Sequence, residues 1–395
     1  MNDFLDILKG EEVKKFIVDN QNTDSQKLLL NPPKEFKNNI RIIADQILAR
    51  KKAKGKLSSW SENIDLIMPP PLSIEQASSE STGIYKSRLL KGQHLIDLTG
   101  GMGIDCLALG KYFSKITYVE QQHDLCRVFQ HNCDVLGRNI NVLNKKAEDV
   151  LELLKSDASS KVFYIDPARR DDSKNKVFKL EDCSPNLKEL IPIMKELGNQ
   201  ILIKLSPLID IKSILTEFPH VKEIHIVSIK NDCKELLVSI DFSCKDETTI
   251  KTVNLETEQA EYHFKLSEEK NSESQYGNPE DYIFEPNTSI LKSGAFKKIG
   301  EDFELKKLHK HTHLYTSNSI VKGFPGRVFQ IISDADKKSI KQYGSYGKMN
   351  VMTRNYPVKP HALKKKWKLK DGGNFFLIGF RDFSEKSNLI IAKRI

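Results

Sequence analysis

The sequence predicts an α/β fold built on a doubly wound sheet of seven strands, with a helical region before it and a small α+β module after it. Apolar runs typical of buried strands alternate with helically spaced runs between residues 95 and 242. The first run passes into a glycine-rich turn at residues 100–103, and the last two runs are separated only by residues 230–235. Because that connection is too short for a crossover helix, we expect the seventh strand to be antiparallel to its neighbours.

The alternation gives each element an expected place. Strands are expected near residues 95–99, 116–120, 140–144, 161–166, 200–205, 223–229 and 236–242. Helices are expected near residues 103–113, 122–137, 147–155, 185–197 and 210–217. Helical spacing over residues 1–50 predicts a small helical domain or lid. After the residues of the sheet, we expect short strands such as Tyr262–Lys265 among turns, and then a helix at 289–299. The chain is expected to end in a strand, a basic helix and a further strand.

The first strand ends in Asp97, and the turn that follows contains Thr99, Gly101 and Gly103. Glycines permit positive φ and let a ligand approach bare N–H groups at a helix N-terminus, where the helix dipole adds partial positive charge. The second strand ends in Glu120, where a carboxylate can accept hydrogen bonds from ribose hydroxyls. The pattern therefore predicts a nucleotide-cofactor site rather than an ordinary turn.

Two cofactor classes fit such a turn, NAD and S-adenosylmethionine (SAM). A dinucleotide fingerprint requires a third small residue in the helix, and this chain has Cys106 there. Asp97 favours SAM, because SAM carries an ammonium and a sulfonium where NAD carries a pyrophosphate. NAD stays as an alternative that rests on Gly101, Gly103 and Glu120.

An antiparallel seventh strand is the arrangement of class I SAM-dependent methyltransferases, and this stretch resembles their Rossmann-like sheet. The resemblance implies that Glu148 or Asp149, after the third strand, holds the adenine amine, although both residues also suit an ordinary helix start. Polar residues at 73–82 lie just before the first strand and could cover the cofactor. Alternatively, Ser73 or Ser78 caps a helix.

The fourth strand runs into Asp166, Pro167, Ala168 and Arg169. The carboxyl end of a central strand faces the crevice where ligands bind in such sheets, and the proline keeps Asp166 out of the helical conformation. The position is similar to the Asp/Asn-Pro-Pro-aromatic motif of methyltransferases that act on nucleic-acid nitrogens, in which the acid orients the amine and the aromatic ring stacks on the base. Here Ala168 replaces the second proline and Arg169 replaces the aromatic residue.

Asp166, Pro167 and Arg169 are accordingly the predicted catalytic residues. Arg169 and Arg170 could stack on a base or bind a phosphate. Arg170 and Lys204, the latter at the end of the fifth strand, are predicted to contact substrate. The alternatives are an ion pair of the arginines with a neighbouring aspartate and a purely structural role of Lys204 in its turn. The charged residues 170–179 are predicted to form a substrate loop.

The positive charge is concentrated at the C-terminus. Residues 321–395 contain 17 Lys or Arg against 5 Asp or Glu, a balance of +12, so the preceding 320 residues carry −3 of the total +9. Such a concentration is typical of a surface that binds a polyanion, although a solvated basic face is the alternative. Lys364, Lys365 and Lys366 are the predicted RNA-binding residues within it.

Other features exclude several classes of protein. No apolar run reaches about 18 residues, which argues against a transmembrane helix, and the acidic N-terminus lacks the order of a signal peptide, so we expect a cytoplasmic protein. The six cysteines form no C-x-x-C pair and are expected to be reduced. His309, His311 and His313 alternate as on one strand face, but no cysteine or carboxylate joins them at ligand spacing, so no metal is expected.

Taken in order, five segments resemble a bacterial family of class I SAM-dependent methyltransferases with a ferredoxin-like segment and a THUMP-like C-terminal domain. The segments are Glu-Gln-x-Ser-Ser-Glu at 75–80, Asp-Leu-Thr-Gly-Gly-Met-Gly-x-Asp at 97–105, Asp-Pro-Ala-Arg-Arg at 166–170, the ferredoxin-like stretch, and Asn-Tyr-Pro-Val-Lys-Pro at 355–360.

This likeness covers nearly the whole chain and implies domains at 1–85, 86–245, 246–322 and 323–395, SAM as cofactor, and methylation of a nucleoside in structured RNA such as tRNA or rRNA, since THUMP domains bind RNA. Two alternatives are a SAM-dependent methyltransferase acting on a protein or small molecule, and a non-catalytic RNA-binding protein with a relict SAM fold. The sequence leaves open the methylated atom, the RNA and the oligomeric state.

Overall fold

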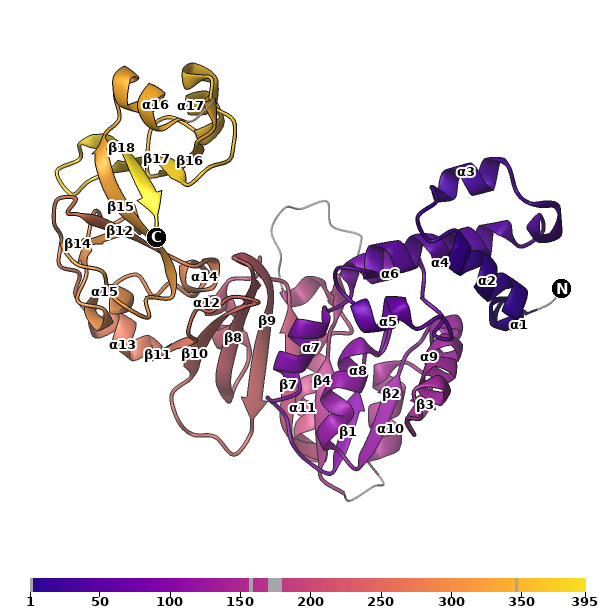
Figure 1. Cartoon of the computed structure of the whole chain (residues 1–395). Helices are drawn as coiled ribbons and strands as arrows, with labels where there is room; N and C mark the ends of the chain where they lie inside the picture. Colours follow the sequence, from indigo (N-terminus) through magenta and orange to yellow (C-terminus); the bar gives the residue numbers. More distant parts are fainter. Residues whose placement is uncertain (1–2, 156–158, 170–179, 345–346) are drawn as a thin grey trace. The chain divides into compact units, whose positions relative to one another are not determined.

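The structure is a computed structural model that describes residues 3–155, 159–169, 180–344 and 347–395 (Figure 1). The chain forms two compact units. The first contains Met1–Val221 and Leu237–Lys245, and the second contains Lys222–Leu236 and Asp246–Ile395.

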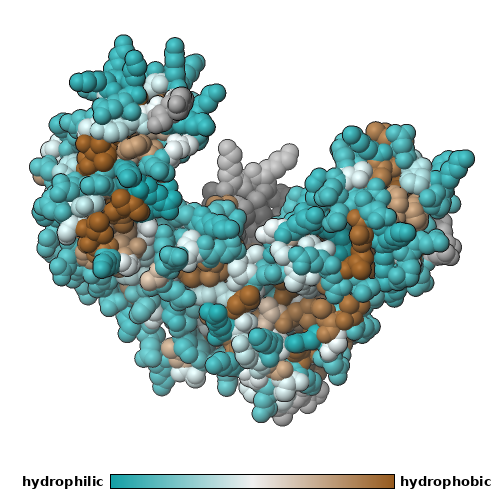
Figure 2. Space-filling model, viewed as in Figure 1, coloured by the Kyte–Doolittle hydropathy of each residue, from teal (hydrophilic) through white to brown (hydrophobic). Residues whose placement is uncertain are grey.

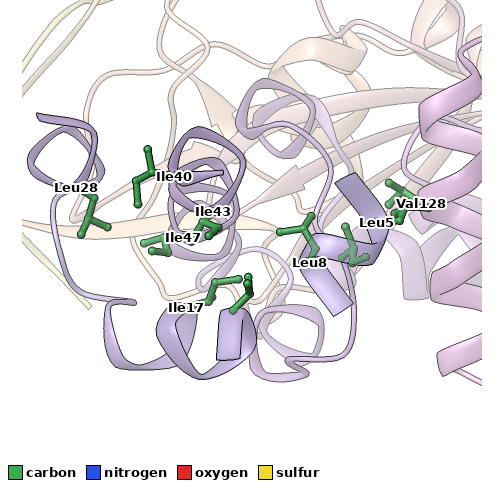
Figure 3. Packing of buried hydrophobic residues seen from close by; sticks show 10 residues of the cluster. Leu5, Leu8, Ile17, Leu28, Ile40, Ile43, Ile47 and Val128 are labelled. Carbon is green, nitrogen blue, oxygen red and sulfur yellow. The ribbon is translucent and has the colours of Figure 1, made fainter. Parts of the chain in front are cut away.

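In the part of the chain that the structure describes, seven α-helices precede the large sheet, and the first four of them form one hydrophobic cluster with the sheet domain. They are α1 (Phe4–Lys9), α2 (Glu11–Asp19), α3 (Ser25–Leu30), α4 (Ile40–Ala53), α5 (Ser58–Glu62), α6 (Pro71–Gln76) and α7 (Glu80–Lys86), with a 3₁₀ turn at Lys34–Phe36. Leu5, Leu8, Ile17 and Ile43 pack together and against Val128 of α9 (His123–Val135), as Figure 3 shows. The predicted helical region is therefore part of the first unit, packed on a helix of the sheet domain.

The large sheet contains the seven predicted strands, with two further strands at one edge. Its first seven strands are β1 (His94–Asp97), β2 (Lys115–Val119), β3 (Asn141–Leu143), β4 (Lys161–Ile165), β7 (Gly198–Leu205), β8 (Val221–Ile229) and β9 (Asp232–Asp241). The hydrogen-bonded order is β11-β10-β8-β9-β7-β4-β1-β2-β3. β1 pairs in parallel with β2 and β4, and β4 pairs in parallel with β7. The carboxyl ends of these four strands therefore lie along the same side of the sheet.

Helices follow the strands where the alternation predicted them. They are α8 (Ile104–Leu109) with a 3₁₀ turn at Gly110–Tyr112, α9, α10 (Ala147–Leu154), α11 (Leu187–Leu197) and α12 (Ile211–Glu217). β8 and β9 are longer than expected, and only Lys230 and Asn231 connect them, at φ of 47° and 69°. A two-residue connection with positive φ at both positions is a hairpin turn, so β9 is antiparallel to β8 as predicted.

The two additional strands are β10 (Thr249–Leu255), which pairs in parallel with β8, and β11 (Tyr262–Lys265), which pairs antiparallel with β10. A short strand was expected at β11, whereas the start of β10 was interpreted as a turn. A small antiparallel pair, β5 (Ala168–Arg169) with β6 (Cys183–Ser184), was not foreseen either.

The second unit contains a seven-stranded sheet in the order β13-β14-β12-β15-β18-β17-β16. The strands are β12 (Tyr282–Pro286), β13 (Lys306–Lys307), β14 (Tyr315–Ser317), β15 (Gly326–Asp334), β16 (Asn350–Arg354), β17 (Phe375–Arg381) and β18 (Ser387–Arg394), and the helices are α13 (Leu266–Asn271), α14 (Thr288–Ser293), α15 (Lys298–Asp302), α16 (Lys337–Tyr343) and α17 (Pro360–Trp367). The single helix expected at 289–299 is two helices, because Gly294 adopts φ of 82° and ends the first.

The histidines at 309, 311 and 313 are not on a strand face, contrary to expectation. They lie in the connection between β13 and β14. His309 Nε2 contacts Glu385 Oε1 at 2.9 Å, and the His313 ring stacks on Phe296 at 3.7 Å between centroids. Among the described residues, no group of three or more His, Cys, Asp or Glu is arranged to hold a metal ion.

All six cysteines are free thiols, as expected. Within the described residues, no helix has the length and apolar character needed to cross a bilayer.

Candidate cofactor and substrate site

The carboxylate of Asp97 is buried at the end of β1 with one oxygen unsatisfied. Its Oδ1 accepts a hydrogen bond from the Thr99 backbone N at 3.1 Å, whereas Oδ2 has no hydrogen-bond partner among the described residues. Burial raises the pKa of Asp97 well above its ordinary value, and nearby carboxylates, that of Asp105 foremost, raise it further. A buried, unsatisfied carboxylate oxygen is costly, so this position suits a cationic ligand group.

Two glycines of the turn are required by aromatic rings beneath it. A Cβ on Gly100 would lie 2.1 Å from the Tyr118 ring, and a Cβ on Gly103, at φ of 78°, would lie 1.9 Å from the Phe129 ring. The two rings stack at 4.0 Å between centroids. Gly101 differs, because at φ of 52° its Cβ would meet only the Thr99 carbonyl oxygen at 3.9 Å. The turn thus has a rigid aromatic floor and one face open at Gly101.

Glu120 closes the other side of the turn. Its Oε2 accepts a hydrogen bond from Gly101 N at 3.0 Å, and its Oε1 accepts one from Gln122 N at 2.8 Å. The structure therefore brings Asp97, the glycine turn and Glu120 together, as the sequence pattern predicted.

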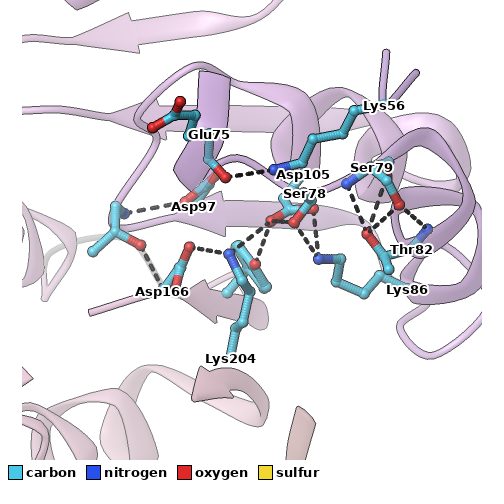
Figure 4. Close-up of polar contacts among 12 residues, drawn as sticks. Lys56, Glu75, Ser78, Ser79, Thr82, Lys86, Asp97, Asp105, Asp166 and Lys204 are labelled. Carbon is cyan, nitrogen blue, oxygen red and sulfur yellow. Dashed lines mark hydrogen bonds and ion pairs between the residues drawn. The ribbon is translucent and has the colours of Figure 1, made fainter. Parts of the chain in front are cut away.

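Asp166 lies beside this turn, at the end of β4. Its backbone N donates a hydrogen bond to Thr99 Oγ1 at 2.6 Å, which ties the strand end to the turn. Its carboxylate forms an ion pair with Lys204 on the neighbouring β7, and the two side chains point toward each other in Figure 4. Pro167 follows and is half-buried. Two strand ends thus place the predicted catalytic acid and the predicted substrate lysine in contact.

A buried network of charges, not foreseen from the sequence, supports this pair. Asp105 accepts hydrogen bonds through Oδ2 from Ser78 Oγ at 2.8 Å and Tyr164 Oη at 2.7 Å, and its Oδ1 lies 2.8 Å from Lys86 Nζ. Lys204 Nζ is 3.9 Å from the same carboxylate. Figure 4 shows the run of charges from Lys86 through Asp105 and Lys204 to Asp166.

Electrostatics decide the protonation of this network. Burial alone would raise the pKa of Asp105, but the charges of Lys86 and Lys204 and the hydrogen bonds from Lys86 and Tyr164 hold it below its ordinary value. The carboxylate therefore stays ionised, and its charge is shared between two lysines.

Ser78 belongs to this network and does not cap a helix. The N-cap of α7 is Ser79, whose side chain accepts from Thr82 N, so the capping role expected for Ser73 or Ser78 is wrong. A seryl pair just before a helix is ambiguous in sequence, because either hydroxyl satisfies the capping pattern.

Within its described residues, the structure does not connect the remaining predicted site residues to this network. Glu148 and Asp149 are exposed in the first turn of α10, where their side chains make no hydrogen bond to another described residue. The backbone of Arg169 pairs with Cys183. Arg170 and the predicted substrate loop at 170–179 lie outside the described residues.

The three predicted RNA-binding lysines lie on α17 in the second unit. Lys364 Nζ forms an ion pair with Asp371 Oδ2 at 2.6 Å, Lys365 is exposed, and Lys366 Nζ lies 5.2 Å from the centre of the Trp367 ring. The surface over α16 and α17 is hydrophilic in Figure 2.

Comparison with known protein families identifies the C-terminal part of the chain. Residues 282–325 match a family described as a ferredoxin-like domain, and residues 326–394 match one described as THUMP domain-like. No curated protein is similar enough in sequence to count as a match.

Among solved structures, the chain is similar to a predicted methyltransferase from Porphyromonas gingivalis W83, with 31% identity, a TM-score of 0.86 and 97% of each chain covered. A much weaker likeness is to a predicted class I SAM-dependent methyltransferase from Listeria monocytogenes, with 11% identity, a TM-score of 0.34, and coverage of 63% of this chain and 91% of that chain. The extent of the first match shows that the chain belongs to the family of the P. gingivalis protein, the class I SAM-dependent methyltransferases that carry a ferredoxin-like segment and a THUMP-like C-terminal domain.

Proposed function

We propose that this protein transfers the methyl group of SAM to a nucleoside of structured RNA, either tRNA or rRNA. The observation that carries the cofactor assignment is the buried Asp97 Oδ2 without a partner, next to a glycine turn with one open face. An ammonium fits that oxygen because it supplies both charge and hydrogen-bond donors. The pyrophosphate of NAD would instead place negative charge beside a buried carboxylate.

Each cofactor contact has a candidate residue. Asp97, Thr99, Gly101 and Gly103 would hold the methionine end, and Glu120 would accept the ribose hydroxyls. Glu148 or Asp149 would hold the adenine, as both are exposed in the helix that follows β3. When bound, SAM supplies a methyl group on a sulfonium, and we expect the transfer to proceed without a metal.

The substrate side combines the strand ends with the basic module. Asp166, Pro167 and Arg169 would orient the nucleophile, and Arg170 and Lys204 would contact the substrate. Lys364, Lys365 and Lys366 would bind phosphates. The similarity of residues 326–394 to THUMP domains and the local charge balance of +12 support RNA as the partner.

Calorimetric titration with SAM tests the cofactor assignment. We expect micromolar binding, reduced about 10- to 100-fold in Asp97→Asn, because a hydrogen bond to a charged group is worth about 1.5–3 kcal/mol. Asp124→Asn, a change of the same kind on the exposed face of α9, serves as control. Absence of heat with SAM, or equal binding by NAD, would refute the assignment.

Transfer of tritiated methyl from SAM to total RNA tests the substrate. Label in RNA supports the proposal, and label only in protein or small molecules favours the second enzyme class. RNA binding without any SAM binding would identify a relict cofactor domain.

A further inference from the structure

We infer that the methylated atom is a hydroxyl oxygen, the ribose 2′-hydroxyl of RNA, and that Asp166 and Lys204 are the pair that activates it. This inference rests on the proposed RNA methylation and adds the target atom to it. The observation behind it is that the acid at the end of β4 is paired with an ammonium, which an acid that only orients an amine does not need.

The two members of the pair are exposed to different extents. The side chain of Asp166 is 37% exposed, whereas that of Lys204 is 14% exposed. A substrate that enters the site therefore meets the carboxylate, with the ammonium beside it and mostly covered by protein. Thr99 fixes the backbone of Asp166 through the hydrogen bond from its N–H, so the carboxylate is held next to the glycine turn.

The ammonium is held between two carboxylates. Lys204 Nζ pairs with Asp166 and lies 3.9 Å from Asp105, which Lys86, Ser78 and Tyr164 hold in turn. Such support fixes the position of Lys204 before any substrate binds, which is the condition for electrostatic stabilisation of a developing charge.

A nitrogen of a nucleobase and a ribose hydroxyl need different groups in a methyltransferase site. An amine nitrogen of a nucleobase becomes more positive as it attacks the methyl group, so its site needs orientation by hydrogen-bond acceptors and a stacking surface rather than a cation. A hydroxyl is a weak nucleophile, so it needs a base for its proton and a cation for the negative charge that develops on oxygen. Ala168 and Arg169 stand where the nitrogen-directed motif has proline and the stacking aromatic ring, so the chain lacks that aromatic ring and carries the acid and the cation.

With Asp166 and Lys204 in these roles, the proton, the methyl group and the charges of the transfer are all accounted for. As the 2′-oxygen forms a bond to the methyl carbon, its O–H bond breaks and the proton passes to the Asp166 carboxylate and then to water. The bond between the methyl carbon and sulfur breaks with its electron pair on sulfur, so the sulfonium of SAM becomes a neutral thioether. The ammonium of Lys204 stabilises the oxygen while it is negative.

Alkaline hydrolysis of the labelled RNA tests the target atom. Alkali cleaves RNA through attack by the free 2′-hydroxyl, so a 2′-O-methyl group protects the adjacent bond. We expect the tritium in alkali-stable dinucleotides. Tritium in mononucleotides would show base methylation, which overturns this inference and leaves the proposed function intact. If SAM binds but no RNA is labelled, both are overturned.

Variants of the pair test its role. In Lys204→Met, transfer should fall by about 10²- to 10³-fold, the usual cost of removing one group that stabilises a developing negative charge, with SAM affinity unchanged. Lys204→Arg should retain more activity than Lys204→Met because it keeps the positive charge. Lys212→Met, on the exposed face of α12, is the matched control.

Asp166→Asn serves as a second variant that preserves side-chain shape, and circular dichroism of each variant verifies the fold. Full activity in either Lys204→Met or Asp166→Asn would overturn the role of the pair.

Discussion

Asp97, which is buried, and Asp105, which is mostly buried, are carboxylates of one site whose pKa values move in opposite directions. Asp97 has its pKa raised by burial, so its contribution to stability is present below the ordinary carboxyl pKa of about 3.9 and is lost as pH rises through the folded value. Ionisation of the buried carboxyl therefore destabilises the folded protein. We therefore expect Asp97→Asn to unfold at a higher temperature than the parent at pH 7, although it binds SAM less well. The difference should shrink at pH 4, as measured by calorimetric melting.

Asp105 should behave in the opposite way. Its pKa is held low by Lys86 and Lys204, so its stabilising effect is present above pH about 3.9 and is lost as pH falls. Asp105→Asn leaves Lys86 buried without its counter-charge and should cost about 3–5 kcal/mol at pH 7, by urea unfolding. A loss under 1 kcal/mol would contradict the assigned ion pair.

Gly103 is a third residue whose identity the structure constrains. Ala at this position combines a positive φ with a contact of 1.9 Å to the Phe129 ring. Gly137, at φ of 62° with nothing within 4 Å, isolates the backbone effect. We expect Gly137→Ala to cost about 1–2 kcal/mol, and Gly103→Ala to cost a further 1–3 kcal/mol or so for overpacking, both measured by urea unfolding. Equal losses would show that the ring moves aside freely.

Strands whose buried positions carry apolar residues were predictable from the sequence, whereas a strand with polar residues at buried positions was not. β4 and β7 are rich in buried aliphatic residues, and their sequence pattern placed them correctly. β10 was missed because its buried positions include Thr252 and Asn254, which carry no hydrophobic signal. The histidines were misplaced because alternation in sequence also occurs in an irregular connection.

Helix α17 should determine RNA affinity if its lysines bind phosphates. Replacing Lys364, Lys365 and Lys366 by Gln should weaken binding of structured RNA and make the plot of log affinity against log salt less steep by about 2–3, since each phosphate contact contributes about 0.7–0.9. The matched control replaces Lys310, Lys322 and Lys386, exposed lysines scattered over the same unit. An equal effect in both triples would mean that net charge alone, and not this helix, governs binding.

At the scale of the whole molecule, the two binding functions should respond differently to salt. RNA affinity of the full chain should fall steeply between about 50 and 200 mM salt because counterion release drives it, whereas SAM affinity should change little because Asp97 is buried. Fluorescence titration of RNA and calorimetry of SAM on the same preparation measure both. Salt-insensitive RNA binding would contradict the assignment of the basic segment.

The site was predictable where it follows from strand ends. Asp97, Glu120, Asp166 and Lys204 each end or follow a strand, and parallel strands bring such residues to one edge. Lys86 could not be found in this way, because a lysine in the last turn of a helix is typical of a solvated position. Its complete burial arises from packing of α7 on α8, where Gly83 allows a close approach to Ala108.

The buried ion pair of Lys86 with Asp105 constrains how this family can change over evolution. Loss of either partner alone would leave an uncompensated charge inside the protein, whereas joint replacement by neutral residues of similar size avoids that penalty. Relatives should therefore keep both residues or lose both together. A family tree should show the two positions substituted on the same branches, with Ser78 free to vary wherever the pair has gone.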